Sequence, residues 1–244
     1  MAKPQELMKF YGSKEGNDAD VLIESRAVLS KKDFVSTGVI TYSLGEIMEL
    51  EMPQSEAFQL GDKVKVTIYS KSGLFVFDTT VVAKDQGSVV IINPPENRKK
   101  FTEKREFPRI DVTQDGLLHS VHDLRKQNKH QFENPVVISI KNISLSGVGF
   151  TILENSIVDK IVEKHLHLDV ELDLGFSMAC KTEIVRKEKS ESGIYYGARY
   201  IDVPDMKTNA LRAFILKNQI EMYFDHKRKA EYKSQLEKKS AANQ

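Results

Sequence analysis

Along most of the 244-residue chain, short runs of β-branched and aromatic residues alternate with polar ones, a pattern typical of strands with one buried face. In the first half, turns containing glycine separate these runs at spacings typical of a small antiparallel barrel. The expected strands lie at residues 21–23, 27–29, 38–42, 46–52, 63–69, 74–82 and 88–92. We therefore expect residues 1–97 to form a small β-barrel.

One strand of this half carries two acidic side chains. Leu50 and Met52 alternate with Glu49 and Glu51, so we expect the glutamate face of that strand to be in solvent. Residues 1–97 hold ten Lys and Arg against fourteen Asp and Glu, a balance of −4, and show no cluster with ligand spacing. This half is therefore expected to partner the rest of the chain and not to hold an anion. The simpler alternative is a spacer with no role of its own.

The second half predicts six further strands, at residues 110–113, 136–140, 147–152, 165–174, 178–186 and 193–201, with a short helix at 157–164. The clearest alternation is in 165–174. Between the first two strands, residues 114–134 are polar and basic, and we expect a surface loop or a short helix there. The fold class predicted for the chain is mainly β, with two small antiparallel β-barrels and a C-terminal α-helix.

The C-terminal helix is predicted to begin at Pro204 and Asp205, where Asp205 is a suitable N-cap. Its apolar stripe, made of Leu211, Phe214, Ile215 and Met222, should seal a barrel end or dock against the other domain. Residues 225–239 carry six Lys and Arg against three Asp and Glu. We expect this charged tail to be a frayed, solvated helix.

Composition is that of an ordinary soluble protein, with 40% hydrophobic and 29% charged residues and a net charge of +1. The lone Cys180 excludes an internal disulfide and is expected to be a small buried hydrophobe. No signal sequence and no apolar run near the roughly 20 residues needed to span a bilayer is apparent. We therefore expect a cytoplasmic protein that does not insert into a membrane.

The connector between the two halves is strongly basic. Residues 98–109 contain six cations, among them Lys104, Arg105 and Arg109, against two glutamates, a net charge of +4. Pro108 disfavours helical angles at Phe107, so Arg105 and Arg109 should be displayed on an extended or turned backbone. Two guanidinium forks on a bent segment suit a ligand with phosphates and guanine edges. A plain solvated linker is the simpler alternative.

A polar motif follows the strand at 136–140. Asn142, Ser144 and Gly147 stand at the first, third and sixth places of N-I-S-L-S-G. The amide and hydroxyl can hydrogen-bond a base or a phosphate, and the glycine permits positive φ and close backbone approach to a ligand. A plain β-turn would use the same residue types.

Together, R-x-x-x-R at Arg105 and Arg109 and N-x-S-x-x-G from Asn142 resemble the PilZ domain, a receptor module for cyclic di-GMP. The order of elements resembles the two-domain flagellar-brake (YcgR-like) class. The resemblance implies an N-terminal YcgR-like barrel at 1–97, a ligand-binding linker at 98–109, a PilZ domain with its closing helix at 110–224, and a charged tail at 225–244.

The resemblance also implies the ligand and the output. Cyclic di-GMP would bind to Arg105, Arg109, Asn142, Ser144 and Gly147, with Lys104 at a place where the family often has another arginine. Binding would change the arrangement of the two domains and regulate a protein target, such as a flagellar motor or stator component. Where this chain has Asn142 the family often has Asp, and the neutral amide cannot make the charge-assisted hydrogen bond that an Asp carboxylate would make. The number of ligands and the oligomeric state stay open.

Three alternatives to this interpretation are an RNA or single-stranded DNA binder, an enzyme and a metal-binding protein. A small-barrel binder of RNA or single-stranded DNA would use the basic connector, but only Phe101 and Phe107 lie among its cations as stacking residues. An enzyme is disfavoured, because no nucleophile with a base, no metal set and no phosphate-binding glycine loop is apparent. His119 and His122 are three residues apart without a convincing third ligand, so we expect no metal.

Overall fold

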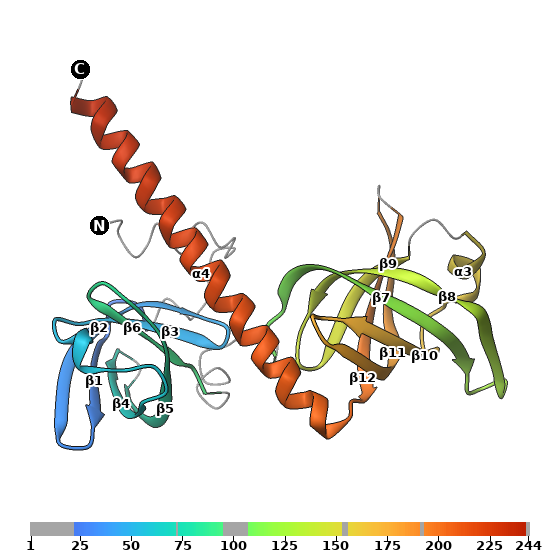
Figure 1. The fold of residues 1–244 in the computed structure, drawn as a ribbon, viewed down its shortest axis with the longest axis horizontal. Coiled ribbons are helices and arrows are strands. Elements are labelled where there is room, and N and C mark those ends of the chain that lie inside the picture. The colour runs from blue at the N-terminus through green and yellow to red at the C-terminus, as the bar shows by residue number, and fades with distance from the viewer. Residues whose placement is uncertain (1–21, 72, 95–106, 153–155, 191–192, 243–244) are drawn as a thin grey trace. The chain divides into compact units, whose positions relative to one another are not determined.

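The structure, a computed structural model, describes residues 22–71, 73–94, 107–152, 156–190 and 193–242 (Figure 1). The fold is mainly β and contains two closed six-stranded antiparallel barrels and a long C-terminal helix, which confirms the predicted fold class. The chain divides into two compact units, Met1–Glu106 with Asn218–Gln244, and Phe107–Lys217.

The first barrel has the strand order β1-β2-β3-β6-β5-β4, with every neighbouring pair antiparallel. A short 3-10 helix, η2 (Ser55–Ala57), precedes β4. The strands are β1 (Arg26–Lys31), β2 (Phe34–Leu44), β3 (Ile47–Glu51), β4 (Lys63–Ser70), β5 (Gly73–Asp85) and β6 (Ser88–Ile92). Their inward-facing side chains, including Leu29, Ile40, Leu50, Ile68 and Val89, form one buried core.

The second barrel has the strand order β10-β11-β12-β9-β8-β7. A short helix, α3 (Ser156–Ile161), lies between β9 and β10. The strands are β7 (Ile110–Asp123), β8 (Asn128–Ile143), β9 (Gly147–Ile152), β10 (His167–Asp173), β11 (Ser177–Ser190) and β12 (Gly193–Asp202). Each strand expected from residue 136 onward therefore has a counterpart.

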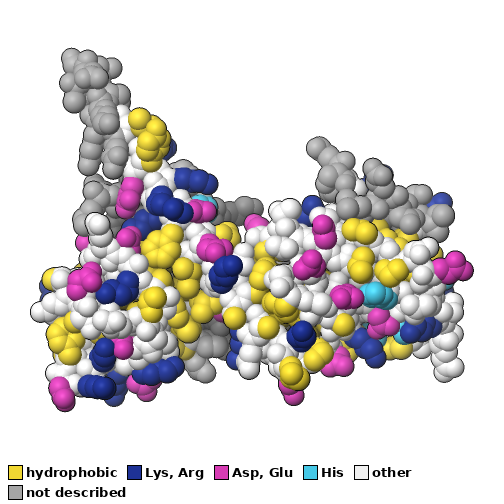
Figure 2. Space-filling view, in the orientation of Figure 1, with side chains coloured by type: hydrophobic (Ala, Val, Ile, Leu, Met, Phe, Trp, Pro, Cys, Tyr) yellow, Lys and Arg dark blue, Asp and Glu magenta, His cyan; other side chains and the backbone are white. Residues whose placement is uncertain are grey.

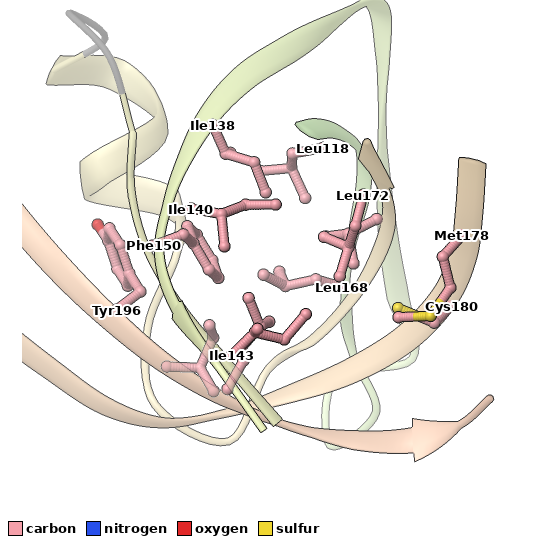
Figure 3. Packing of buried hydrophobic residues seen from close by; sticks show 14 of the residues in the cluster. Leu118, Ile138, Ile140, Ile143, Phe150, Leu168, Leu172, Met178, Cys180 and Tyr196 are labelled. Atoms are coloured by element: carbon pink, nitrogen blue, oxygen red, sulfur yellow. The ribbon is translucent and has the colours of Figure 1, made fainter. Parts of the chain in front are cut away.

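The core of the second barrel is apolar. Figure 3 shows Leu118, Ile138, Ile140, Leu168 and Leu172 pointing toward one another inside it, and each of these five is fully buried. Their alternation with outward polar residues is the period expected of strands. Cys180 is buried here as predicted, and burial raises its pKa to about 12, so the thiol stays protonated.

The prediction of a loop or short helix at 114–134 is wrong, because β7 and β8 continue through this region as a long antiparallel hairpin. Leu118 and Val121, embedded in the polar stretch, are both buried in the core. Gly116 pairs with β10 so closely that an added Cβ would lie 2.8 Å from the Glu171 carbonyl oxygen. A few apolar residues and one glycine thus extend the strand.

Helix α4 (Asp205–Ala242) begins where the sequence predicts. Leu211 and Ile215 of its predicted stripe join the core of the second barrel, so this part of the helix covers that core. Residues from Asn218 onward belong to the first unit. There, Tyr223 is fully buried and its ring lies 4.8 Å from that of Tyr42 on β2.

Two expectations about charged residues are wrong at the same place. Glu49 on β3 is buried and not in solvent, and Lys227, in the stretch expected to be solvated, lies 2.8 Å from its Oε1. Burial alone would raise the pKa of Glu49, but the charge and hydrogen bond of Lys227, with a hydrogen bond from Thr41, outweigh burial and lower it. Docking of α4 therefore turns an outward-facing glutamate into a buried, charged one.

Candidate functional site

The sequence motifs meet at one end of the β7–β8 ladder. Ile110, the first residue of β7, pairs with Ile143 near the end of β8. Arg109 comes directly before Ile110, and Asn142 and Ser144 flank Ile143. Strand register alone therefore brings Arg109 to the end of the barrel that carries the N-x-S-x-x-G motif.

Arg109 is exposed, and its guanidinium makes no hydrogen bond or ion pair with any residue that the structure describes. Its fork of donors is therefore available to an anion or a base edge. Lys104 and Arg105 lie outside the described residues, so their predicted roles stay predictions.

Asn142 is held by a tyrosine that sequence reasoning did not select. Its Nδ2 donates to the hydroxyl of Tyr195 on β12 over 3.0 Å, and that hydroxyl lies 3.4 Å from Asn142 Oδ1. An amide has two N–H donors and an acceptor oxygen with two lone pairs, so part of its capacity is left for a ligand. Tyr195 therefore fixes the orientation of the side chain without saturating it.

Ser144 is nearly fully buried, and its hydroxyl serves the chain around it. Oγ lies 3.3 Å from the Gly147 carbonyl oxygen, to which it donates, and accepts a hydrogen bond from the backbone N–H of Ser146 at 3.3 Å. The backbone N–H of Ser144 also donates to the Gly147 carbonyl over 2.9 Å. Ser144 thus stabilises the connection from β8 to β9, the role given by the turn interpretation.

Gly147 does not have the positive φ that its motif position suggested. An added Cβ would instead lie 2.2 Å from the carbonyl oxygen of Ala198, because β9 and β12 approach closely there. The backbone of Tyr200 on β12 also donates to the Ser146 carbonyl over 3.0 Å. The glycine is therefore required by strand packing, which is a physical reason separate from any ligand.

Two further glycines lie beside Asn142 on the outer side of the barrel. Asn142 pairs with Gly149 on β9. Gly149 in turn pairs with Gly197 on β12, and Gly197 pairs with Arg186 on β11. The side chains of the core alternate to the other face of these strands. Gly149 and Gly197 are themselves buried, because the Tyr195 hydroxyl covers Gly149 and the Arg186 side chain lies against Gly197. We call Asn142, Gly149, Gly197, Tyr195 and Arg186 the glycine row.

Arg186 borders this row. Its Cζ lies 5.9 Å from the centre of the Tyr195 ring, and its Nε donates to Glu188. Gly149 and Gly197 are a sequence signal for the row, but only the strand register shows that Gly149 lies beside Asn142 and that Gly197 lies beside Gly149. An anion that approaches Asn142 would thus meet two arginines. Arg186 is at the β11 end of the glycine row, and Arg109 directly precedes β7.

Arg199, a further candidate on β12, is engaged elsewhere. Its Nε and one terminal nitrogen donate to Glu183 Oε2 on β11 over 2.8 and 2.6 Å. The pKa of Glu183 is lowered, first by this hydrogen bond from Arg199 and then by one from His165, so the carboxylate stays charged. This ion pair occupies the guanidinium of Arg199 on the barrel surface.

The two histidines that were considered for a metal have separate partners. His119 Nε2 lies 3.3 Å from Glu171, and His122 Nε2 lies 2.8 Å from Asp169. Among the described residues, no group of three or more His, Cys, Asp and Glu side chains is placed to hold a metal ion.

No described helix combines the length and the apolar character that crossing a membrane requires.

Comparison with known proteins identifies the domain that carries this site. Residues 103–217 match the model of the PilZ domain. The range begins in the basic connector, includes Arg105, Arg109 and the Asn142 motif, and ends within α4. No curated protein matches the chain.

Several solved structures are similar in fold. The inhibitor of motility MotI/DgrA of Bacillus subtilis has 13% identity and a TM-score of 0.40, covering 82% of this chain and 98% of its own. YcgR of Escherichia coli in complex with c-di-GMP has 12% identity and a TM-score of 0.38, covering 92% and 94%. PlzA of Borreliella burgdorferi in complex with c-di-GMP has 12% identity and a TM-score of 0.34, covering 87% and 98%.

Proposed function

Residues 103–217 are a PilZ domain, and from this premise we propose that the protein is a receptor for cyclic di-GMP and acts by binding, not by catalysis. The observation that carries the proposal is the register at the start of β7, by which the exposed Arg109 and Asn142 share one end of the barrel. Two groups of the expected ligand-binding set, far apart in sequence, are thereby neighbours.

The ligand has two guanine bases and two phosphodiesters, and the residue types of the motifs suit both kinds of group. Arg105 and Arg109 provide planar forks for guanine edges or phosphates. Asn142 keeps an N–H and acceptor capacity for a base edge, because Tyr195 uses only part of its amide. Gly149 and Gly197 carry no side chain, which leaves room for the Tyr195 hydroxyl beside Asn142 and for the Arg186 side chain against β12.

In this proposal the six residues of the motifs do not all touch the ligand in the same way. Arg105, Arg109 and Asn142 bind it directly, while Ser144 and Gly147 set the backbone from β8 to β9 that presents Asn142. Lys104 contributes charge without the planar stacking and forked bonding of an arginine. Tyr195 and Arg186 are the additional residues that the glycine row assigns to the site.

The proposed output is a change in the arrangement of the two domains. Arg105 lies in the connector, so a ligand held by both Arg105 and the barrel would link the connector to the barrel. A ligand shifts such an equilibrium only by its different affinity for the two arrangements. We propose that a protein partner reads this change in the cytoplasm, with motility control as the output and a flagellar motor or stator component as the target.

Isothermal titration of the full chain with cyclic di-GMP tests the proposal. We expect a dissociation constant of about 1 μM or tighter, near −8 kcal/mol. Arg109→Ala and Arg105→Ala should each weaken binding by at least about tenfold, since each loses a charge-assisted pair of bonds. Arg212→Ala, an exposed arginine on α4, is the matched control and should bind as the unchanged chain does.

Absence of binding, or binding that both arginine variants leave unchanged, would contradict the proposal. Titration with a single-stranded RNA of random sequence tests the alternative, because that binding should weaken steeply with salt and tolerate loss of one arginine. Small-angle scattering with and without cyclic di-GMP tests the output. An unchanged scattering curve at saturation would contradict the domain rearrangement while leaving the receptor function intact.

A further inference from the structure

A basic cavity lies on the same barrel, at the opposite end of β7 from Arg109. It is formed by the turn between β7 and β8, by α3 and by the segment that enters β10, and has a volume of about 450 Å³. β7 has 14 residues, so the turn is about 45 Å along the strand from Arg109. The cavity is therefore separate from the site proposed for cyclic di-GMP.

The wall of the cavity is dominated by cations. Four side chains with fixed positive charge line it, against two carboxylates, a net charge of +2. The cations are Arg125, Lys126, Lys160 and Lys164. Two imidazoles, those of His130 and His165, also line it. Figure 2 shows histidine side chains on the second barrel lying beside basic and acidic ones.

Both carboxylates already have partners. Asp123 Oδ1 accepts the backbone N–H groups of Arg125 and Lys126 at 3.0 and 3.2 Å, and Glu163 Oε1 accepts a hydrogen bond from Lys187 over 2.6 Å. No ion pair joins the side chains of Arg125 or Lys160 to any carboxylate within the described ranges. The positive charge of these two residues is therefore not neutralised by the wall.

Three apolar side chains also line the cavity. Val121 and Leu166 line it together with Ile161 of α3, and the ring of His130 packs edge-on against Phe132, with centres 4.9 Å apart. Ligand cavities of a few hundred Å³ commonly combine an apolar lining with a small number of convergent polar groups. An arginine fork with two or three lysines suits the three oxygens of a terminal phosphate.

We propose that this cavity binds a phosphomonoester with a small apolar body. The phosphate lies against Arg125 and Lys160, with Lys126 and Lys164 adding charge, and the apolar body lies on Val121, Ile161 and Leu166. A carboxylate ligand of the same size would bind more weakly, because it offers two oxygens and a single negative charge. This site would make the barrel a receptor for two chemically different phosphates.

The test is nuclear magnetic resonance of the full chain labelled with ¹⁵N, titrated with phenyl phosphate as the probe. We expect chemical-shift changes centred on the amides of Arg125 and Lys126, saturating at no more than about 10 mM. Arg125→Ala with Lys160→Ala should weaken binding by at least about tenfold. The matched control pair, Lys181→Ala with Arg212→Ala, removes the same charge from exposed positions on the same unit and should leave binding unchanged.

Four comparisons decide between explanations. Inorganic phosphate should shift the same amides more weakly, because it lacks the apolar body. Benzyl alcohol producing equal shifts would overturn the proposal, since the phosphate would then be irrelevant. Shifts that the control pair abolishes equally would overturn it as well, because they would report only net charge. Arg109→Ala should leave phenyl phosphate binding intact, which separates this site from that of cyclic di-GMP.

Discussion

The ammonium nitrogen of Lys227, near the middle of α4, lies 2.8 Å from Oε1 of the buried Glu49 on β3. The same nitrogen lies 2.7 Å from Oδ2 of Asp85, so one cation serves two carboxylates. The side chain of Glu49 is only 7% exposed and that of Lys227 18%. Helix residues after Asn218 are therefore fastened to the first barrel by a charge cluster largely removed from water.

Replacing Lys227 with methionine should destabilise the first unit. Lys227→Met keeps most of the side chain's bulk and leaves Glu49 as an unpaired buried charge, a change that typically costs about 3–5 kcal/mol. Urea denaturation followed by circular dichroism measures the loss. Lys229→Met, two residues along and exposed, is the control and should change stability by less than about 0.5 kcal/mol. Equal stability of the two variants would show that the cluster does not hold the helix.

The pair should also define a pH window for stability. The pKa of Glu49 is lowered from 4.5, so its contribution is complete above that value and is lost as pH falls through the lowered pKa. The pKa of Lys227 is raised from 10.5, so its contribution is complete below that value and is lost as pH rises through the raised pKa. The pair thus stabilises the fold between these limits.

The measurement is the difference in free energy of unfolding between the unchanged chain and the variant Glu49→Gln with Lys227→Met. This difference should be constant from about pH 6 to pH 9 and change toward lower pH as Glu49 takes up a proton. A difference that drifts steadily through the neutral range would instead assign the effect to other titrating groups.

Much of the fold follows from local pattern, and the exceptions have a physical cause. Alternation predicts strands such as β10, because Leu168, Val170 and Leu172 all face the core. It misjudges β3, where alternation places Glu49 outside the barrel but cannot show that α4 covers that outer face. The covering residue, Lys227, is 178 positions away in the chain.

The candidate site divides in a similar way. Residue types and spacing identify Asn142 and Ser144, since hydrogen-bonding side chains beside a glycine are visible in the sequence. The contact of Asn142 with Tyr195 depends on strand register across three strands, which no short motif encodes. For the same reason, the sequence suggests that glycine is needed at position 147 for a positive φ. In the structure glycine is needed there because of the carbonyl oxygen of Ala198, on a strand about fifty residues later.

Tyr195 should contribute to cyclic di-GMP affinity through Asn142. Tyr195→Phe keeps the ring and removes the hydroxyl that accepts from Asn142 Nδ2, so the amide loses its fixed orientation. We expect binding to weaken by about three- to tenfold, in line with a net hydrogen-bond contribution of about 0.5–1.5 kcal/mol. Isothermal titration measures the change. Tighter binding would show that the tyrosine competes with the ligand for Asn142.

The matched control for that variant is on the same strand. The hydroxyl of Tyr200 is buried and makes no hydrogen bond with the described part of the chain. Tyr200→Phe should therefore leave affinity unchanged and maintain or slightly raise stability, because it removes a buried polar group without a partner. If both phenylalanine variants weaken binding equally, the effect belongs to strand β12 as a whole and not to the bond with Asn142.

Gly147→Ala should destabilise the second barrel whether or not Gly147 contacts a ligand. The new Cβ would lie 2.2 Å from the Ala198 carbonyl oxygen, so β9 and β12 must separate, and such overpacking typically costs about 1–3 kcal/mol. In Gly197→Ala the new Cβ would meet only the Arg186 side chain, at 3.2 Å from its Cβ and 3.9 Å from its Cδ, so this variant should cost less. Urea denaturation ranks the two variants. Stability of Gly147→Ala equal to that of the unchanged chain would contradict the packing role, and any loss of ligand binding would then report a direct contact.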